Sequence, residues 1–214
     1  MSTDPAASPP AAKAMTSEQI EALDAIAGRL VTLRSKRSGL GLAVCAVARG
    51  DGASLTAAGL ATAIAALGYS TVLVDADLEE PGLPSFISSD PTALGLADLL
   101  ADERVSVADV MQPIVGLPPL SVVHAGAGGK GSADLVSTAG FSAFVADCML
   151  NFEFTIIDTP PANRTTHAIE IVSAVGAAIV VARRDLSYMD DVATLARSIS
   201  GANATVLGAI LIES

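Results

Sequence analysis

Short, uninterrupted apolar runs alternate with longer stretches of helical periodicity over most of this chain, and this alternation restricts the possible folds more than any other feature. Continuous apolar runs are typical of strands that helices cover on both faces, whereas a strand with one wet face alternates apolar and polar residues. The runs therefore predict a sheet that is buried on both sides. The expected strands are Leu42–Ala48, Thr71–Asp75, Leu120–His124, Phe154–Asp158, Ala177–Ala182 and Val206–Leu211.

Stretches with helical spacing fill the intervals between these runs. A strand-to-helix succession at this spacing predicts an α/β protein with a doubly wound, mainly parallel sheet flanked by helices. With no internal repeat and no second domain visible, we expect a single domain over residues 16–214. The expected helices are Leu55–Leu67, Leu96–Leu100, Ala133–Asn151, His167–Ser173 and Met189–Ser200.

The first 15 residues are rich in Pro, Ala and Ser and lack periodicity, so we expect a disordered tail there. A helix is expected to begin at Thr16, because Gln19 stands three residues later as a capping-box partner. Basic residues near its end suit the negative pole of a helix dipole. They are Arg29, Arg34, Lys36 and Arg37.

Charge and aromatic content argue against several kinds of partner. The net charge is −11 and aromatic residues make up only 3% of the chain, which disfavours binding of nucleic acid or anionic lipid. The longest apolar run, Ile171–Ala182, is shorter than the roughly 20 residues that a membrane span requires. With no secretory signal pattern at the start, and with Cys45 and Cys148 in apolar surroundings, we expect a cytoplasmic protein without a membrane span.

A glycine-rich turn follows the first expected strand and opens a helix. Such a turn points successive backbone N–H groups at one place, and the helix dipole adds partial positive charge there, so the turn can hold phosphate. A complete phosphate loop also needs a lysine before the Ser or Thr, and Ala53 stands at that position. A tight turn that merely requires glycine is the alternative interpretation. The expected cofactor-binding residues are Gly50, Asp51, Gly52, Ala53, Ser54 and Leu55.

Acidic residues follow two of the expected strands. Asp75 and Asp77 come at the end of one strand, and Asp158 ends another. Ligands of parallel α/β sheets bind outside the carboxyl ends of the strands, where such carboxylates can hold a metal ion. Ser54, Asp75 and Asp158 are therefore the candidate ligands of a weak Mg²⁺ site. Carboxylates satisfied by nearby backbone N–H groups are the alternative.

The order of the motifs GDGAS, VLVDADLEEP, GLADLL and FTIIDTPP resembles the cytoplasmic bacterial tyrosine kinases, in the ParA/MinD branch of P-loop ATPases with a deviant Walker A motif. The resemblance runs from about residue 40 to the C-terminus. It implies that Gly50–Ser54 correspond to the Walker A loop, Asp75 and Asp77 to the Walker A′ motif, and Asp158 to the Walker B acid. By this resemblance Asp75, Asp77 and Asp158 are the catalytic candidates, vestigial if turnover is lost.

The resemblance also implies a partner and a pathway. Members associated with polysaccharide act with a membrane-embedded polysaccharide co-polymerase in the synthesis and export of capsule or exopolysaccharide. We therefore expect the cytoplasmic segment of such a co-polymerase as the partner, which would bring this chain to the inner membrane, and we leave homo-oligomerisation open. The cofactor implied is ATP or ADP with Mg²⁺.

Departures from the family pattern bear on activity. Ala53 replaces the Walker A lysine, and losing the contacts of one charged group weakens binding by roughly 10- to 100-fold. Phosphoryl transfer suffers more, because it depends on positive charge in the transition state. An engineered change at Ala53 alone would not explain the other departures. These are Ala48, Leu55, Gly59, Glu79, Glu80 and Ile212, with Tyr69 and Tyr188 the only tyrosines in place of a C-terminal cluster.

These departures favour a catalytically degenerate, kinase-like domain in which nucleotide binding is doubtful. Two other functions remain open: an active ATPase or tyrosine kinase with a substitute cation, and a positioning ATPase of the ParA/MinD type. The candidate substitute cations are Arg49, Arg183 and Arg184. We expect the glycine-rich segment Ala125–Ser132 to be a flexible connection and His124 to cap a strand end.

Overall fold

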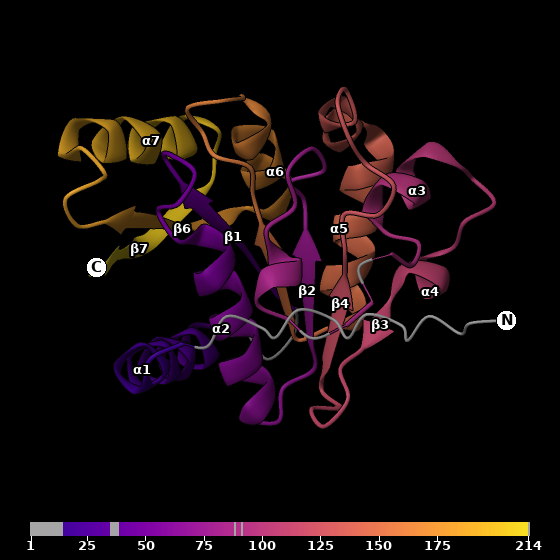
Figure 1. Cartoon of the computed structure of the whole chain (residues 1–214), viewed down its shortest axis with the longest axis horizontal. Coiled ribbons are helices and arrows are strands. Elements are labelled where there is room, and N and C mark those ends of the chain that lie inside the picture. Colours follow the sequence, from indigo (N-terminus) through magenta and orange to yellow (C-terminus); the bar gives the residue numbers. More distant parts are fainter. Residues whose placement is uncertain (1–14, 35–38, 88, 91, 214) are drawn as a thin grey trace, which may run out of the picture.

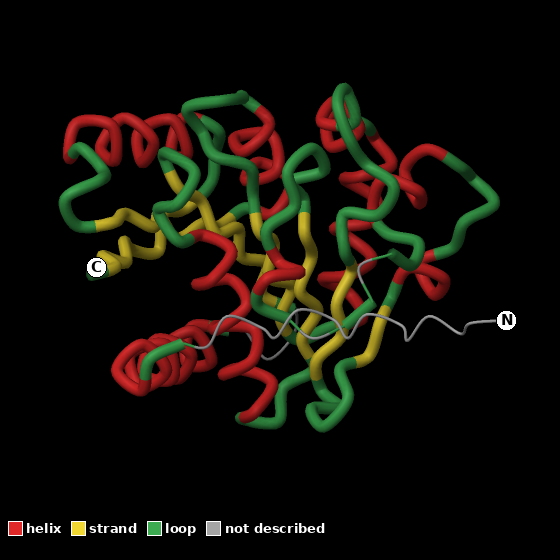
Figure 2. The backbone as a smooth tube through the Cα atoms, viewed as in Figure 1, coloured by secondary structure: helices red, strands yellow, loops and turns green. Residues whose placement is uncertain are grey.

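A single sheet of seven strands forms the centre of the molecule, in the order β3-β4-β2-β5-β1-β6-β7 (Figures 1 and 2). The computed structural model describes residues 15–34, 39–87, 89–90 and 92–213. All neighbouring strands pair in parallel except β3, which is antiparallel to β4. The strands are β1 Leu40–Ala46, β2 Thr71–Asp75, β3 Gln112–Pro113, β4 Leu120–Val123, β5 Phe154–Asp158, β6 Ala177–Arg183 and β7 Thr205–Ile212.

Helices cover both faces of this sheet, α1 and α2 on one side and α5, α6 and α7 on the other (Figure 1). This arrangement confirms the predicted doubly wound α/β fold with a mainly parallel sheet. The helices are α1 Ser17–Leu33, α2 Ala53–Ala66, α3 Leu96–Ala101, α4 Val107–Val110, α5 Ala139–Asn151, α6 His167–Val175 and α7 Met189–Gly201, with 3₁₀ turns at η1 Leu83–Ser85 and η2 Ala133–Ser137.

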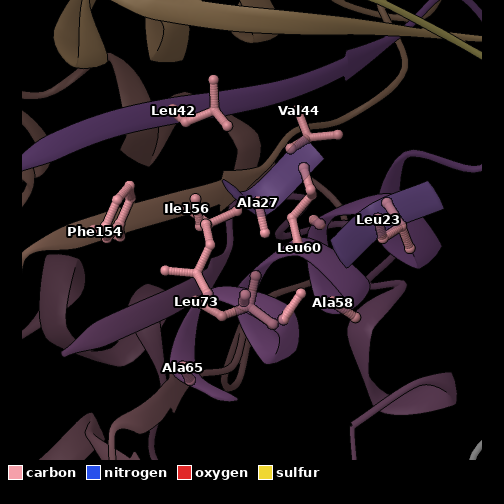
Figure 3. Close-up of a cluster of buried hydrophobic side chains, with 14 of the residues drawn as sticks. Leu23, Ala27, Leu42, Val44, Ala58, Leu60, Ala65, Leu73, Phe154 and Ile156 are labelled. Atoms are coloured by element: carbon pink, nitrogen blue, oxygen red, sulfur yellow. The ribbon is translucent and has the colours of Figure 1, made fainter. Parts of the chain in front are cut away.

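The two-sided burial of β1 explains its continuous apolar sequence. Leu42 and Val44 pack against α1 and α2, whereas Ala43 and Cys45 pack on the opposite face with α6 and α7. Successive side chains of a strand point to opposite faces, so both sets must be apolar when helices cover both. Figure 3 shows the first of these clusters, in which Leu60 of α2 lies close to Val44.

The predicted helix over Ala133–Asn151 is wrong in one respect, since the structure divides it into η2 and α5. Thr138 has extended backbone angles between the two (φ −86°, ψ 157°), and its hydroxyl accepts a hydrogen bond from the N–H of Phe141 at 3.4 Å. A threonine that caps a new helix in this way ends the preceding turn. The short elements β3 and α4 were not predicted, because two and four residues are too few for a periodic pattern.

The capping box predicted at the start of α1 is present, but the expected basic helix end is not. Thr16 and Gln19 cap each other's backbone N–H groups. No basic residue occupies the last turn, and Arg34 instead bonds Glu153 at 2.9 Å and covers the ring of Tyr69. Lys36 and Arg37 lie outside the described residues, as does the predicted tail apart from Met15. Within the described ranges, no helix is long and apolar enough to cross a membrane.

The glycine-rich segment Ala125–Ser132 is held to the rest of the fold by hydrogen bonds, contrary to the flexible connection that we expected. Asp98 accepts from the N–H of Ala127 at 3.0 Å, and Glu79 accepts from the N–H of Gly131 at 2.7 Å. The backbone of α3 also docks directly on this segment, with the N–H of Ala97 donating to Ala125 at 2.9 Å. The segment therefore joins α3 and the end of β2 to β4.

We predict that Gly95→Ala destabilises the protein by about 1–3 kcal/mol, because overpacking at a close backbone approach forces a shift. A Cβ on Gly95 would overlap the backbone of His124 and Gly126. Gly28→Ala in α1 is the matched control, since a Cβ there meets nothing within 4 Å and alanine favours helix. Urea unfolding of both variants measures the difference. Equal stability of the two would contradict this packing.

Candidate functional site

The loop between β1 and α2 has the backbone shape of a phosphate cradle. Gly50 and Gly52 adopt left-handed angles, with φ of 91° and 100°, and Gly52 is the N-cap of α2. The carboxylate of Asp51 accepts a hydrogen bond from the N–H of Ala48 at 2.9 Å, which closes the turn. Glycine reaches these angles without a steric cost, so the loop can present its backbone N–H groups at the start of α2.

This loop borders a cavity of about 520 Å³, together with the segments that follow β2 and β5 and the ends of β6 and β7. Five of the six predicted binding residues line the cavity: Gly50, Gly52, Ala53, Ser54 and Leu55. Asp51 is the exception, because it is fully buried and its carboxylate turns back to the loop's own backbone. It shapes the cradle instead of facing the cavity.

Two buried carboxylates lie beside the loop. Asp75 and Asp158 end the neighbouring strands β2 and β5 at the same register position, and both are almost completely buried. Asp75 accepts hydrogen bonds from the N–H groups of Asp77 at 3.2 Å and Leu83 at 3.1 Å. Among the described residues, neither carboxylate oxygen of Asp158 has a hydrogen-bond partner, although the hydroxyl of Ser54 lies near enough to favour its charged form.

Burial makes both carboxylates reluctant to ionise. Desolvation raises the pKa of Asp75 to about 7, an effect that its backbone hydrogen bonds oppose. Desolvation also raises the pKa of Asp158 well above its usual value, and the nearby charge of Asp75 raises it further. Asp77 is less buried, and its pKa is raised by desolvation while Arg49 and Arg164 act in the opposite direction. A cation at this place would relieve the repulsion between the acids.

The residues fit a Mg²⁺–phosphate group only in part. An unpartnered buried carboxylate at Asp158 beside the Ser54 hydroxyl is an oxygen donor set that Mg²⁺ accepts. Asp75 contributes less, because both of its oxygens already accept backbone hydrogen bonds. Across the described residues, no cluster of three or more His, Cys, Asp or Glu side chains is arranged to hold a metal ion. The phosphates themselves would have to complete such a site.

Each of the candidate arginines that the structure describes already has an acceptor. Arg49 pairs with Glu80, and Arg183 donates to the carbonyl of Gly50 at 3.1 Å. Arg184 pairs with Glu213 at 2.8 Å. Arg164, which the sequence analysis did not single out, bonds both carboxylate oxygens of Glu80.

Ile212 occupies the side of the cavity next to the loop. A Cβ on Gly52 would overlap the Cδ1 atom of Ile212, so this side chain packs directly over the cradle. His124 is buried after β4, with its ring against the hydroxyl of Ser89, which agrees with its expected place at a strand end. Pairing of His124 with a serine keeps it apart from the acids of the site.

The fold and the loop place this chain in the class of P-loop-type α/β proteins. No protein-family profile matches it. The chain is 26% identical over 161 residues to a putative tyrosine-protein kinase CapB of Staphylococcus aureus, covering 75% of this chain and 69% of that protein. It is 29% identical over 140 residues to the tyrosine-protein kinase CpsD of Streptococcus agalactiae, covering 65% of this chain and 60% of CpsD.

Solved structures agree with these sequence matches. The chimerical protein CapA2B2 is 26% identical and superposes with a TM-score of 0.80, over 89% of this chain and 83% of that one. The septum site-determining protein MinD from Pyrococcus horikoshii, solved with Mg-ADP, gives a TM-score of 0.71 at 20% identity over 81% of this chain and 70% of its own, which supports the fold alone. The chain is therefore a relative of the bacterial tyrosine kinases on the P-loop fold shared with MinD, as its motifs indicated.

We predict that Asp158→Asn stabilises the protein more at about pH 8 than at about pH 5. A carboxylate whose pKa is raised on folding stabilises the folded state while it is protonated, and this stability is lost as pH rises through the folded pKa. The raised pKa of Asp75, about 7, and the raised pKa of Asp158 therefore imply that the wild type loses stability as pH rises above the unfolded pKa near 4. The variant should recover on the order of 1 kcal/mol or more at the higher pH, because each unit of pKa shift corresponds to about 1.4 kcal/mol.

Thermal unfolding at both pH values measures this effect. Asp24→Asn removes an equal charge from an exposed position on α1 and serves as the control. A gain at the higher pH that is the same for both variants would mean that net charge, and not the buried pair, sets the pH dependence.

Proposed function

We propose that this chain is a catalytically degenerate, tyrosine-kinase-like P-loop domain that acts through protein contacts. Its partner would be the cytoplasmic segment of a membrane polysaccharide co-polymerase, and its process the synthesis and export of capsule or exopolysaccharide. The domain would work in the cytoplasm and reach the inner membrane through that partner. The kinase names of the relatives support the ancestry, while the partner and the pathway follow from the family resemblance.

The observation that carries the proposal is Ala53 at the first position of α2, next to Ser54, which lies beside the buried Asp158. In a phosphate loop a lysine at this position reaches the outer phosphates. Here a methyl group lines the cavity. Ser54, the next residue, lies beside the buried carboxylate of Asp158. Transferring a phosphoryl group here would develop negative charge beside carboxylates, which raises the barrier instead of lowering it.

If Mg²⁺ and nucleotide bind, the loop N–H groups would hold phosphate, and Ser54 with Asp158 would face the metal. The metal would supply charge neutralisation between the phosphates and the acids. Asp75 would keep the Asp77–Leu83 segment in place through its backbone hydrogen bonds. The apolar side chain of Ile212 would contact the part of a ligand that lies over the loop.

We predict that the wild type hydrolyses Mg-ATP far more slowly than an active bacterial tyrosine kinase assayed in parallel, and that Ala53→Lys binds Mg-ADP roughly 10- to 100-fold more tightly. Calorimetric titration measures the affinity, and phosphate release measures turnover. Ala57→Lys is unsuitable as a control because Ala57 is buried. Gly28→Lys, on the open surface of α1, adds the same charge without contacting the loop. Wild-type turnover at the rate of the active kinase would contradict the proposal.

We predict direct binding between this chain and the cytoplasmic segment of the co-polymerase from the same organism, with or without nucleotide. A catalytically degenerate domain must dock without ATP turnover. Calorimetry of the two purified components, with and without Mg-ATP, measures it. Binding that appears only with hydrolysable ATP would favour the active enzyme instead.

A working ATPase or kinase is the second candidate, and one observation favours it: Arg49 and Arg183 line the same cavity as the loop. Either guanidinium could take the role of the missing lysine after leaving its present acceptor. This alternative requires saturable Mg-ATP binding with turnover that Asp158→Asn abolishes.

A further inference from the structure

Glu80 joins two arginines that come from distant parts of the chain. Arg49 belongs to the loop after β1, and Arg164 follows β5. Arg164 donates to one oxygen of Glu80 at 2.7 Å and pairs with the other at 2.6 Å, while Arg49 pairs with that second oxygen. One carboxylate thus holds two guanidinium groups together beside the phosphate cradle.

The position of this cluster connects it to the site. Arg49 and Glu80 line the cavity of about 520 Å³ that the loop borders. Glu80 also lines an adjacent cavity of about 370 Å³ together with Arg164 and Asp77. The two arginine charges both act on Asp77, which shows that they lie at the same end of the sheet as the acids. Glu80 therefore stands between two hollows, with a guanidinium on each side.

The chemistry of the pair matches phosphate more closely than carboxylate. Guanidinium groups form paired hydrogen bonds with phosphate oxygens, and two of them can share one diphosphate. A single carboxylate has fewer acceptor sites and less charge. Glu80 and the two arginines are also partly exposed, with side-chain exposures of 38%, 58% and 49%, so solvent competes with this ion pair.

We propose that Arg49 and Arg164 form a binding site for the phosphates of a diphosphate or triphosphate ligand, and that Glu80 occupies this site as an internal substitute. Incoming phosphate displaces the carboxylate, which swings into solvent while its backbone stays in place. The N–H of Glu80 remains bonded to Asp77 at 3.1 Å, so only the flexible side chain has to move. This goes beyond the proposed function, because a domain without turnover can still sense such a ligand.

The site would also explain how phosphate is held without a Walker A lysine. The loop N–H groups and the start of α2 would hold one phosphate, and the two guanidinium groups would hold the next one outward. The negative charge of the neighbouring acids would disfavour binding of an anion without metal unless the positive charge of the arginines offset it. Loss of Glu80 should therefore strengthen binding, whereas loss of either arginine should weaken it.

The test is calorimetric titration of inorganic pyrophosphate, in EDTA so that metal binding does not contribute. Glu80→Gln should bind at least roughly 10-fold more tightly than the wild type, since it frees two charged donors. Glu79→Gln is the matched control, because it removes the same charge at the neighbouring position. The carboxylate of Glu79 accepts from the N–H of Gly131. The control should bind no more tightly than the wild type.

Two further variants separate the site from general electrostatics. Glu80→Asp keeps the charge but shortens the side chain, and should still bind pyrophosphate more tightly than the wild type. Adding Arg164→Ala or Arg49→Ala to Glu80→Gln should remove the gain. Equal affinities of Glu80→Gln and Glu79→Gln, or a gain that survives both arginine substitutions, would overturn the proposal.

Titrations with ADP and with adenosine distinguish a site for a nucleotide from a site for phosphates alone. Tighter binding of ADP than of pyrophosphate assigns the site to a nucleotide, while equal binding assigns it to the phosphates alone; adenosine should not respond to the Glu80 variants in either case. Thermal unfolding of every variant confirms folding. These titrations do not depend on turnover or on docking to a co-polymerase. A negative result would therefore overturn the phosphate site without affecting the tests of the proposed function.

Discussion

Burial of two carboxylates side by side is the interaction on which the rest of this site depends. Parallel pairing of β2 and β5 brings Asp75 and Asp158 to the same register position, and the helices above and below exclude water from both. Their charged forms are therefore costly, and anything that binds here must neutralise them or be neutral itself. The backbone hydrogen bonds to Asp75 offset part of this cost. Within the described part of the chain, the Asp158 carboxylate has no hydrogen-bond partner of normal geometry.

Positive charge near these two carboxylates comes from the dipole of α2 and from arginine side chains. The start of α2 and the glycines of its loop direct partial positive charge toward the cavity, while Ala53 contributes none. Two guanidinium groups near the loop, those of Arg49 and Arg164, pair with the carboxylate of Glu80, and a third, that of Arg183, donates to the carbonyl of Gly50. The alanine at position 53 and the carboxylate of Glu80 thus act on the same quantity, the electrostatic potential beside the loop.

Much of this could be predicted from local pattern. Strands Thr71–Asp75 and Phe154–Asp158 were predicted to the residue, because the continuous apolar run of each strand ends at its carboxylate. The break at Thr138 was not predicted, since helical periodicity continues across it. Arg164 was missed as well. Its role depends on a carboxylate 84 positions away, and no local spacing reports such a pair.

By itself, the sequence determined the layer order, the loop, its missing lysine and the acids at the strand ends, because short-range periodicity and residue type specify these directly. The same apolar excess that gives a mean hydropathy of +0.54 is the interior of a sheet covered on both faces. Only the tertiary structure decided which groups meet. Asp51 turns into its own loop, Ile212 packs over Gly52, and Glu80 bridges two arginines. The contacts of Ile212 and Glu80 join segments that are distant in sequence, and the turn of Asp51 into its own loop depends on burial by the surrounding fold.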